Sequence, residues 1–129
     1  MAGLGDSFML PKPGQDAEHL WVLITRPNPQ THTAIMVNVT TQRPHSDVTV
    51  ILQAGEHPFV QKPSVIFYAD ARIVDARLLE QSVASGAFRV HAPFQSGVLK
   101  KVQDGVIKSP FTPRKVKDAY ATAAAAGLV

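Results

Sequence analysis

The chain has 129 residues, of which 45% are hydrophobic and 18% charged, with a formal net charge of +3 and no cysteine. This balance fits one globular domain with a single core, and the lack of cysteine excludes disulfide scaffolds and thiolate metal sites. The first residues contain no signal region, and no apolar run is long enough to cross a bilayer. We therefore expect a single cytoplasmic domain over residues 1–129 with no membrane partner.

Positive charge is concentrated toward the C-terminus. Residues 1–90 carry seven Lys or Arg against eight Asp or Glu, whereas residues 91–129 carry six against two. The six are Lys100, Lys101, Lys108, Arg114, Lys115 and Lys117. A basic segment is suited to contact nucleic-acid phosphates, although such charges commonly only solvate a helix face. Both interpretations stay open.

Apolar runs rich in β-branched and aromatic residues predict strands in the first three-fifths of the chain. We expect them over 6–10, 19–25, 33–40, 47–52 and 64–74, the last with a bend or bulge near 69–71. A turn is predicted after the first strand at Pro11, Pro13 and Gly14. The segments between strands are too short for crossover helices, which favours antiparallel pairing in a small barrel or sandwich.

After Asp75 the apolar spacing changes to that of helices. A short helix is expected over 76–83 and ends before Gly86, and 87–96 reads as loop or a last strand. One or two helical turns over 98–102 should end at Asp104 and Gly105. Thr112 as N-cap and Pro113 as first helical residue predict a final helix. The chain thus divides into a β-rich barrel body, 1–75, and a basic, partly helical C-terminal segment, 76–129.

No sequence motif for phosphate loops, dinucleotide binding, nucleophile elbows or zinc proteases is present. The five histidines are His19, His32, His45, His57 and His91, and no two lie within five residues of each other. This spacing gives no sign of a metal site. No metal or cofactor is therefore predicted.

The candidate functional residues are polar side chains at predicted strand ends, namely His19, Asn38, Thr40, Thr41, Arg43, Asp70 and Arg72. One interpretation is structural, with backbone hydrogen bonds and an Asp70–Arg72 ion pair. The other joins an acid or base to a cation that stabilises charge at a phosphate, as RNA cleavage through the 2′-hydroxyl requires.

The loop His57-Pro58-Phe59 allows two roles as well. Its imidazole and aromatic ring could bind a ligand by stacking, or could plug the end of the barrel. The sequence leaves both open.

The order of these features resembles the PemK/MazF-like toxins. The resemblance covers roughly residues 3–80 and rests on Gly5-Asp6 opening the first strand, an apolar second strand ending in Thr, Thr40-Thr41 ending the third, and the run from Ser64 to Asp75. The family implies an SH3-like barrel with added helices, so the expected fold class is mainly β, with five to six antiparallel strands and short C-terminal helices. It also implies metal-independent RNA cleavage, an antitoxin partner and a homodimer.

Carried over by residue, the resemblance implies that Asp70 stands at the catalytic acid or base, that Thr40 or Thr41 helps to hold the substrate, and that His19 contacts it. With the strand-end cations and the loop histidine added, the predicted catalytic residues are Asp70, Arg72 and Thr40, and the predicted substrate-binding residues are His19, Thr41, Arg43 and His57. The sequence departs from the family where His19-Leu20 replaces the Arg-Pro that commonly opens the second strand, and where Tyr68 occupies the place of an Arg. Arg72 or Arg43 would supply the missing charge. The alternative is a non-catalytic SH3-like barrel that binds protein or nucleic acid.

Overall fold

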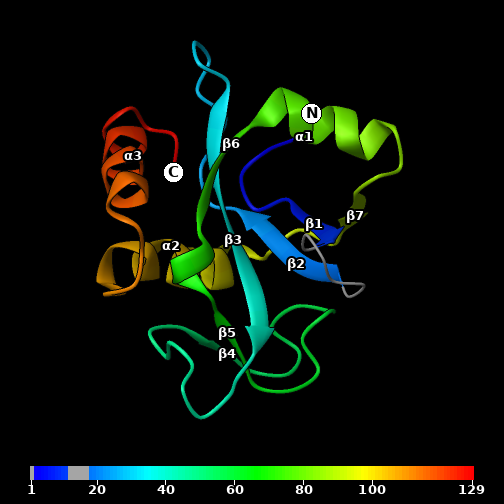
Figure 1. Cartoon of the computed structure of the whole chain (residues 1–129), viewed down its shortest axis with the longest axis vertical. Coiled ribbons are helices and arrows are strands. Elements are labelled where there is room, and N and C mark those ends of the chain that lie inside the picture. The colour runs from blue at the N-terminus through cyan, green and yellow to red at the C-terminus, as the bar shows by residue number, and fades with distance from the viewer. Residues whose placement is uncertain (1, 12–17) are drawn as a thin grey trace.

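A computed structural model describes residues 2–11 and 18–129, and the turn predicted at Pro13 and Gly14 lies outside them. The strands are β1 (Ser7–Pro11), β2 (Glu18–Leu23), β3 (Thr33–Thr41), β4 (Ile51–Leu52), β5 (Ser64–Ile66), β6 (Arg72–Asp75) and β7 (Arg89–His91). The helices are η1, a 3-10 turn (Tyr68–Asp70), α1 (Ala76–Ala84), α2 (Ser96–Lys108) and α3 (Arg114–Ala125). Figure 1 shows their arrangement.

The strands form one antiparallel sheet in the order β4-β5-β3-β2-β1-β7, with β6 also paired to β3. β5 pairs with the C-terminal part of β3 and β6 with its N-terminal part, and η1 separates them. The bend predicted near 69–71 is therefore confirmed. The short strand over 89–91 realises the last strand considered for 87–96 and pairs with β1.

The described strands leave the sheet open, with β4 at one end of the order and β7 at the other. β4 has two residues and β7 three, and no pairing joins these two strands among the described residues. The predicted closed barrel is thus wrong, and the described strands number seven rather than five to six. The coarser expectation of an antiparallel, strand-rich fold with C-terminal helices is confirmed.

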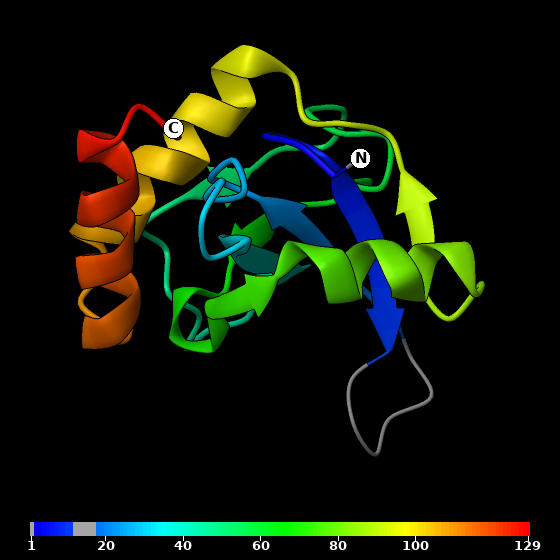
Figure 2. The ribbon, with the colours of Figure 1, turned by 90° about the horizontal axis from the view of Figure 1, so that it is seen from above.

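Helices cover both faces of the sheet (Figure 2). On the α1 face, Leu79 of α1 packs with strand residues that include Trp21 and Met36. On the other face, side chains of α2 and α3, among them Val102 and Tyr120, pack with Val22 and Val37. Alternation along each strand therefore places apolar residues in two cores, and the segment after Asp75 supplies part of both.

The helix predicted over 98–102 extends through Gly105 to Lys108. A side chain at Gly105 would overlap the hydroxyl of Tyr68, which donates a 2.6 Å hydrogen bond to the carbonyl of Val102. Glycine here permits close approach of α2 to the sheet rather than ending the helix. The predicted stop was wrong because glycine weakens a helix only modestly when packing favours it.

Two other boundaries differ from the prediction. The strand expected over 47–52 is reduced to β4, because the carboxylate of Asp47 accepts hydrogen bonds from Thr49 N and Oγ1 and forms a local turn. α3 begins at Arg114 with Pro113 at its N-cap and no side-chain cap bond. The Oγ1 atom of Thr112 is buried without a hydrogen-bond partner among the described residues, so this threonine is not the cap.

Candidate functional site

A pocket of about 540 Å³ lies beside the N-terminal end of β2 and the C-terminal end of β3. Four predicted site residues line it: His19, Thr40, Thr41 and Arg43. The other lining residues are Glu18, Val39, Phe59, Gln61, Lys62 and Ser64. Two strands and the segment before β5 thus bring together an imidazole, hydroxyls and cations.

The register of β2 and β3 explains why His19 and Thr40 meet. Leu20 pairs with Val39 in this antiparallel ladder, and His19 and Thr40 are the next residues outward on each strand. His19 is also paired with Leu10 of β1, whose side chain belongs to the α1-face core. Because side chains alternate along a strand, His19 and Thr40 share the α1 face with Trp21 and Asn38.

The charge of the pocket is predominantly positive. The carboxylate of Glu18 is paired with Arg89 of β7, with 2.6 Å between Oε1 and the guanidinium nitrogen. Arg43 and Lys62 form no ion pair with any residue that the structure describes. Their charges are therefore available to an anionic ligand such as a phosphate.

Asp70 and Arg72 form a second group on the same face. Arg72 lies 3.3 Å from Oδ1 of Asp70, and the Nδ2 of Asn38 donates a 2.9 Å hydrogen bond to Oδ2. The guanidinium carbon of Arg72 also lies 4.7 Å from the ring centroid of Trp21. Asp70 is therefore oriented by an amide and a cation, and Arg72 by a carboxylate and an aromatic face.

The two groups are neighbours, but neither Asp70 nor Arg72 lines the pocket. Asn38 connects them, since it binds Asp70 and lies two residues before Thr40 on β3. Both Trp21 Nε1 and Asn38 Oδ1 are buried without hydrogen-bond partners among the described residues. Asn38 was among the candidates named from strand ends but Trp21 was not, because only the register places the two opposite each other.

His57 and Phe59 have separate positions. His57 is 2% exposed and its ring packs on Phe94 at a centroid distance of 4.7 Å, whereas Phe59 is 39% exposed and lines the pocket. Burial lowers the pKa of His57, with a smaller contribution from the charge of His91, while the contact with the carbonyl of Ala92 opposes the shift. His57 is buried as an anchor of its loop, although the open sheet of the described strands has no barrel end for it to plug, and a ligand contact by Phe59 stays a prediction. A substrate-binding role for His57 stays a prediction.

Lys62 was missed by sequence reasoning. It lies in the loop between Phe59 and β5. The neighbouring Pro63 indicated a loop there but gave no sign of a functional role for Lys62. A lone lysine in a loop carries no signal until the fold places it beside Arg43 and Thr41.

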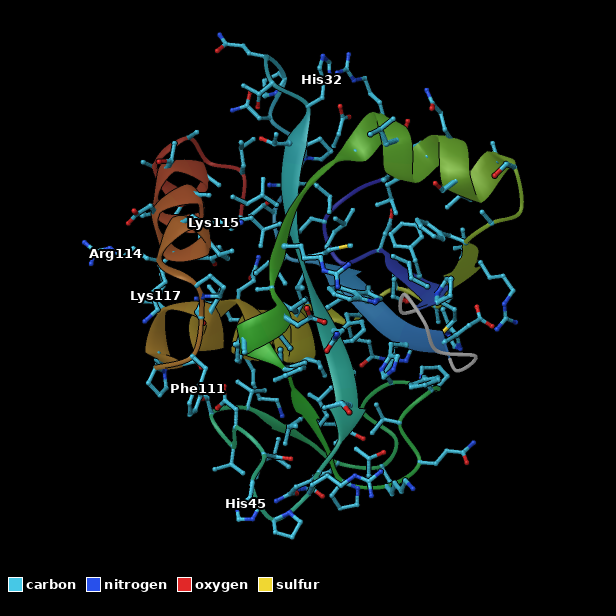
Figure 3. All side chains as sticks on the ribbon, in the orientation of Figure 1. His32, His45, Phe111, Arg114, Lys115 and Lys117 are labelled. Carbon is cyan, nitrogen blue, oxygen red and sulfur yellow. The ribbon has the colours of Figure 1, made fainter. Side chains whose placement is uncertain are left out.

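The basic C-terminal segment is partly neutralised by local pairs. Lys100 bonds Asp104 at 2.7 Å, Lys101 bonds Glu56 at 2.8 Å, and Arg114 lies 3.7 Å from Asp118. Figure 3 shows Arg114 and Lys117 at the outer side of α3 and Phe111 below its start. These exposed charges are separate from the lining of the pocket.

Within residues 2–11 and 18–129, no cluster of three or more His, Asp or Glu is arranged to hold a metal ion. No helix in this part of the chain has the length and apolar character of a membrane span. No protein-family model matches the chain, and a search of curated proteins found no significant match.

Proposed function

We propose that this protein is a metal-independent endoribonuclease of the PemK/MazF-like toxin type, with RNA bound along one face from the pocket at the ends of β2 and β3 to the neighbouring Asp70 and Arg72. The observation that carries the proposal is the meeting of His19, Thr40 and Arg43 from separate segments in one positively charged pocket. We also propose that the sheet is related to SH3-like folds, on the basis of the order of its elements. The proposal further includes an antitoxin partner, pairing of two chains and a cytoplasmic location.

The reaction proposed is transfer of the phosphoryl group to the neighbouring 2′-oxygen. A base removes the proton of the 2′-hydroxyl, the 2′-oxygen attacks phosphorus, and the bond from phosphorus to the 5′-oxygen breaks as that oxygen receives a proton. The products are a 2′,3′-cyclic phosphate and a 5′-hydroxyl. Such chemistry requires proton carriers and charge stabilisation, and no redox step.

The residues have distinct roles in this proposal. Asp70 is the acid or base, oriented by Asn38 and Arg72, and His19 is the second titratable group beside the substrate. Arg43 and Arg72 stabilise phosphate charge, while the hydroxyls of Thr40 and Thr41 bind the substrate. Lys62 adds a contact to the RNA backbone.

The test is incubation of a mixed-sequence single-stranded RNA with purified protein in EDTA, with product ends analysed on denaturing gels. We expect cleavage that falls by about 10²- to 10⁴-fold in Asp70→Asn or His19→Ala. Arg26→Ala is the matched control, because Arg26 follows the opposite end of β2 and lies outside the pocket. Intact RNA together with expression that does not slow growth would refute the nuclease proposal.

A second candidate is a non-catalytic module that binds RNA or protein. It is favoured by the engagement of Asp70 with Arg72 and Asn38, which is the pattern of a structural ion pair, and by its position outside the pocket lining. RNA that binds but is never cut, even by freshly purified wild-type protein, would favour this candidate.

A further inference from the structure

Phe59 is an exposed aromatic side chain in the wall of the charged pocket. It is 39% exposed and lines the pocket with Arg43 and Lys62. Contact with water does not stabilise a phenylalanine ring, whereas contact with a flat apolar surface does. An exposed ring beside cations is therefore suited to bind a ligand that has both a flat apolar surface and a negative charge.

The backbone at Phe59 is held by His57. The amide N–H of Phe59 donates to Nδ1 of His57 at 3.0 Å, so Nδ1 is the unprotonated nitrogen. Nε2 therefore carries the proton and donates it to the carbonyl of Ala92 at 2.7 Å. The next residue, Val60, is buried and closes the turn through a 2.9 Å bond from its N–H to the carbonyl of His57.

Further contacts hold the loop and the ring. Lys101 of α2 bonds Glu56 at 2.8 Å, which ties the start of the loop to the helix on the far side of the sheet. The ring of Phe59 meets that of His91 edge to face, with centroids 6.1 Å apart and an interplanar angle of 83°. The aromatic surface is thus preorganised, which reduces the entropy lost when a ligand stacks on it.

The same pocket supplies groups for the rest of a nucleotide. Arg43 and Lys62 are cations without ion-pair partners among the described residues, and Thr40 and Thr41 offer hydroxyls. Aromatic rings next to cations bind single-stranded nucleic acid. A base can stack on an aromatic side chain only when it is not stacked between neighbouring bases. Bases of a duplex already cover one another and leave no face for the ring.

We propose that Phe59 is a stacking platform for one unpaired base of single-stranded RNA, with the adjoining phosphates on Arg43 and Lys62. This inference rests on the proposed function, since it requires RNA in the pocket, and it adds the side chain on which a base stacks. It holds for a nuclease and for a binding module alike.

The experiment measures fluorescence anisotropy of a labelled 12-nucleotide, random-sequence 2′-O-methyl RNA, which cannot be cleaved through its 2′-oxygen, and of a duplex of equal length. We expect wild-type protein to prefer the single strand. Phe59→Ala should weaken single-strand binding by about 5- to 150-fold, which corresponds to the loss of one stacked base, and Phe59→Trp should retain it. Phe59→Leu keeps the apolar bulk, guards against loss of folding, and should still bind weakly.

Phe111→Ala is the matched control, because Phe111 is 59% exposed at the base of α3 and does not line the pocket (Figure 3). Wild-type affinity in folded Phe59→Ala and Phe59→Leu, or equal affinity for duplex and single strand, would overturn the inference while leaving the proposed function standing. Wild-type protein that neither binds nor cleaves any RNA would instead refute the proposed function.

Discussion

The side-chain amide of Asn38 donates a 2.9 Å hydrogen bond to Oδ2 of Asp70, and this bond ties the centre of β3 to η1. Asn38 is fully buried, whereas the Asp70 carboxylate is partly exposed. The buried asparagine therefore fixes the orientation of the partly exposed Asp70 carboxylate.

Replacement of Asn38 by alanine should destabilise the fold. The carboxylate loses a buried donor, and we expect a loss of about 1–3 kcal/mol in the free energy of unfolding, measured with urea. Asn38→Asp should cost more at neutral pH than at pH 4, because it places a second carboxylate against Asp70. Gln42→Ala, at an exposed site just after β3, is the control and should change stability by less than about 0.5 kcal/mol. Equal stability of Asn38→Ala and wild type would contradict this role.

Two glycines of α2 should respond in opposite ways to alanine. A Cβ at Gly105 would overlap Tyr68 and approach Val50 Cγ2 to 2.5 Å, whereas a Cβ at Gly97 would meet nothing within 4 Å. Overpacking should cost Gly105→Ala about 1–3 kcal/mol despite the better helix propensity of alanine. Gly97→Ala should be neutral or stabilising by up to about 1 kcal/mol. Thermal unfolding of both variants provides the measurement, and a stabilised Gly105→Ala would disprove the close contact.

His57 should make the fold less stable as pH falls. Its pKa is lowered in the folded state by burial and by the charge of His91, against an ordinary value of about 6.5 in the unfolded chain. Between that value and the lower folded pKa, the unfolded state binds a proton that the folded state does not. Stability from this group is therefore complete above about pH 6.5 and declines with falling pH, by at most about 1.4 kcal/mol per pH unit, until the folded pKa is passed.

The measurement is urea unfolding of wild type and His57→Asn between pH 5 and 7.5. The variant should be less stable at pH 7.5, and the gap should narrow toward pH 5, because asparagine does not titrate. His45→Asn is the control, since His45 lies in an exposed loop (Figure 3). A gap that stays constant over this range would show that His57 titrates alike in both states.

Arg43 and Lys62 should contribute to RNA binding through phosphate contacts. Each alanine replacement should weaken binding of a single strand and reduce the slope of log affinity against log salt by about 0.7, because one fewer counterion is released. Arg26→Ala should leave the slope unchanged. Anisotropy titrations at several salt concentrations provide the comparison, and an unchanged slope in both pocket variants would exclude phosphate contacts at these side chains.

Local sequence patterns were sufficient for most of the elements. The period-two alternation around Val37 predicted β3, and the spacing of Leu79 and Val83 predicted α1, because both patterns arise within one segment. The patterns failed where distant residues override local preference. α2 continues through Gly105 because Tyr68 packs there, and β4 is short because Asp47 binds its own neighbours and, at 2.6 Å, Ser109 after α2.

The candidate site was only partly accessible from the sequence. His19, Thr40, Thr41 and Arg43 were named from their positions at strand ends, and the fold brings them to one pocket. The sequence could not place Asp70 beside Asn38 rather than in that pocket, nor separate a buried His57 from an exposed Phe59 two residues later. The sequence by itself determined the antiparallel strands, the helix after Asp75 and the types of polar side chain that could form a site. Only the tertiary structure decided which of those side chains meet, because strand register and helix docking depend on contacts between residues far apart in the chain.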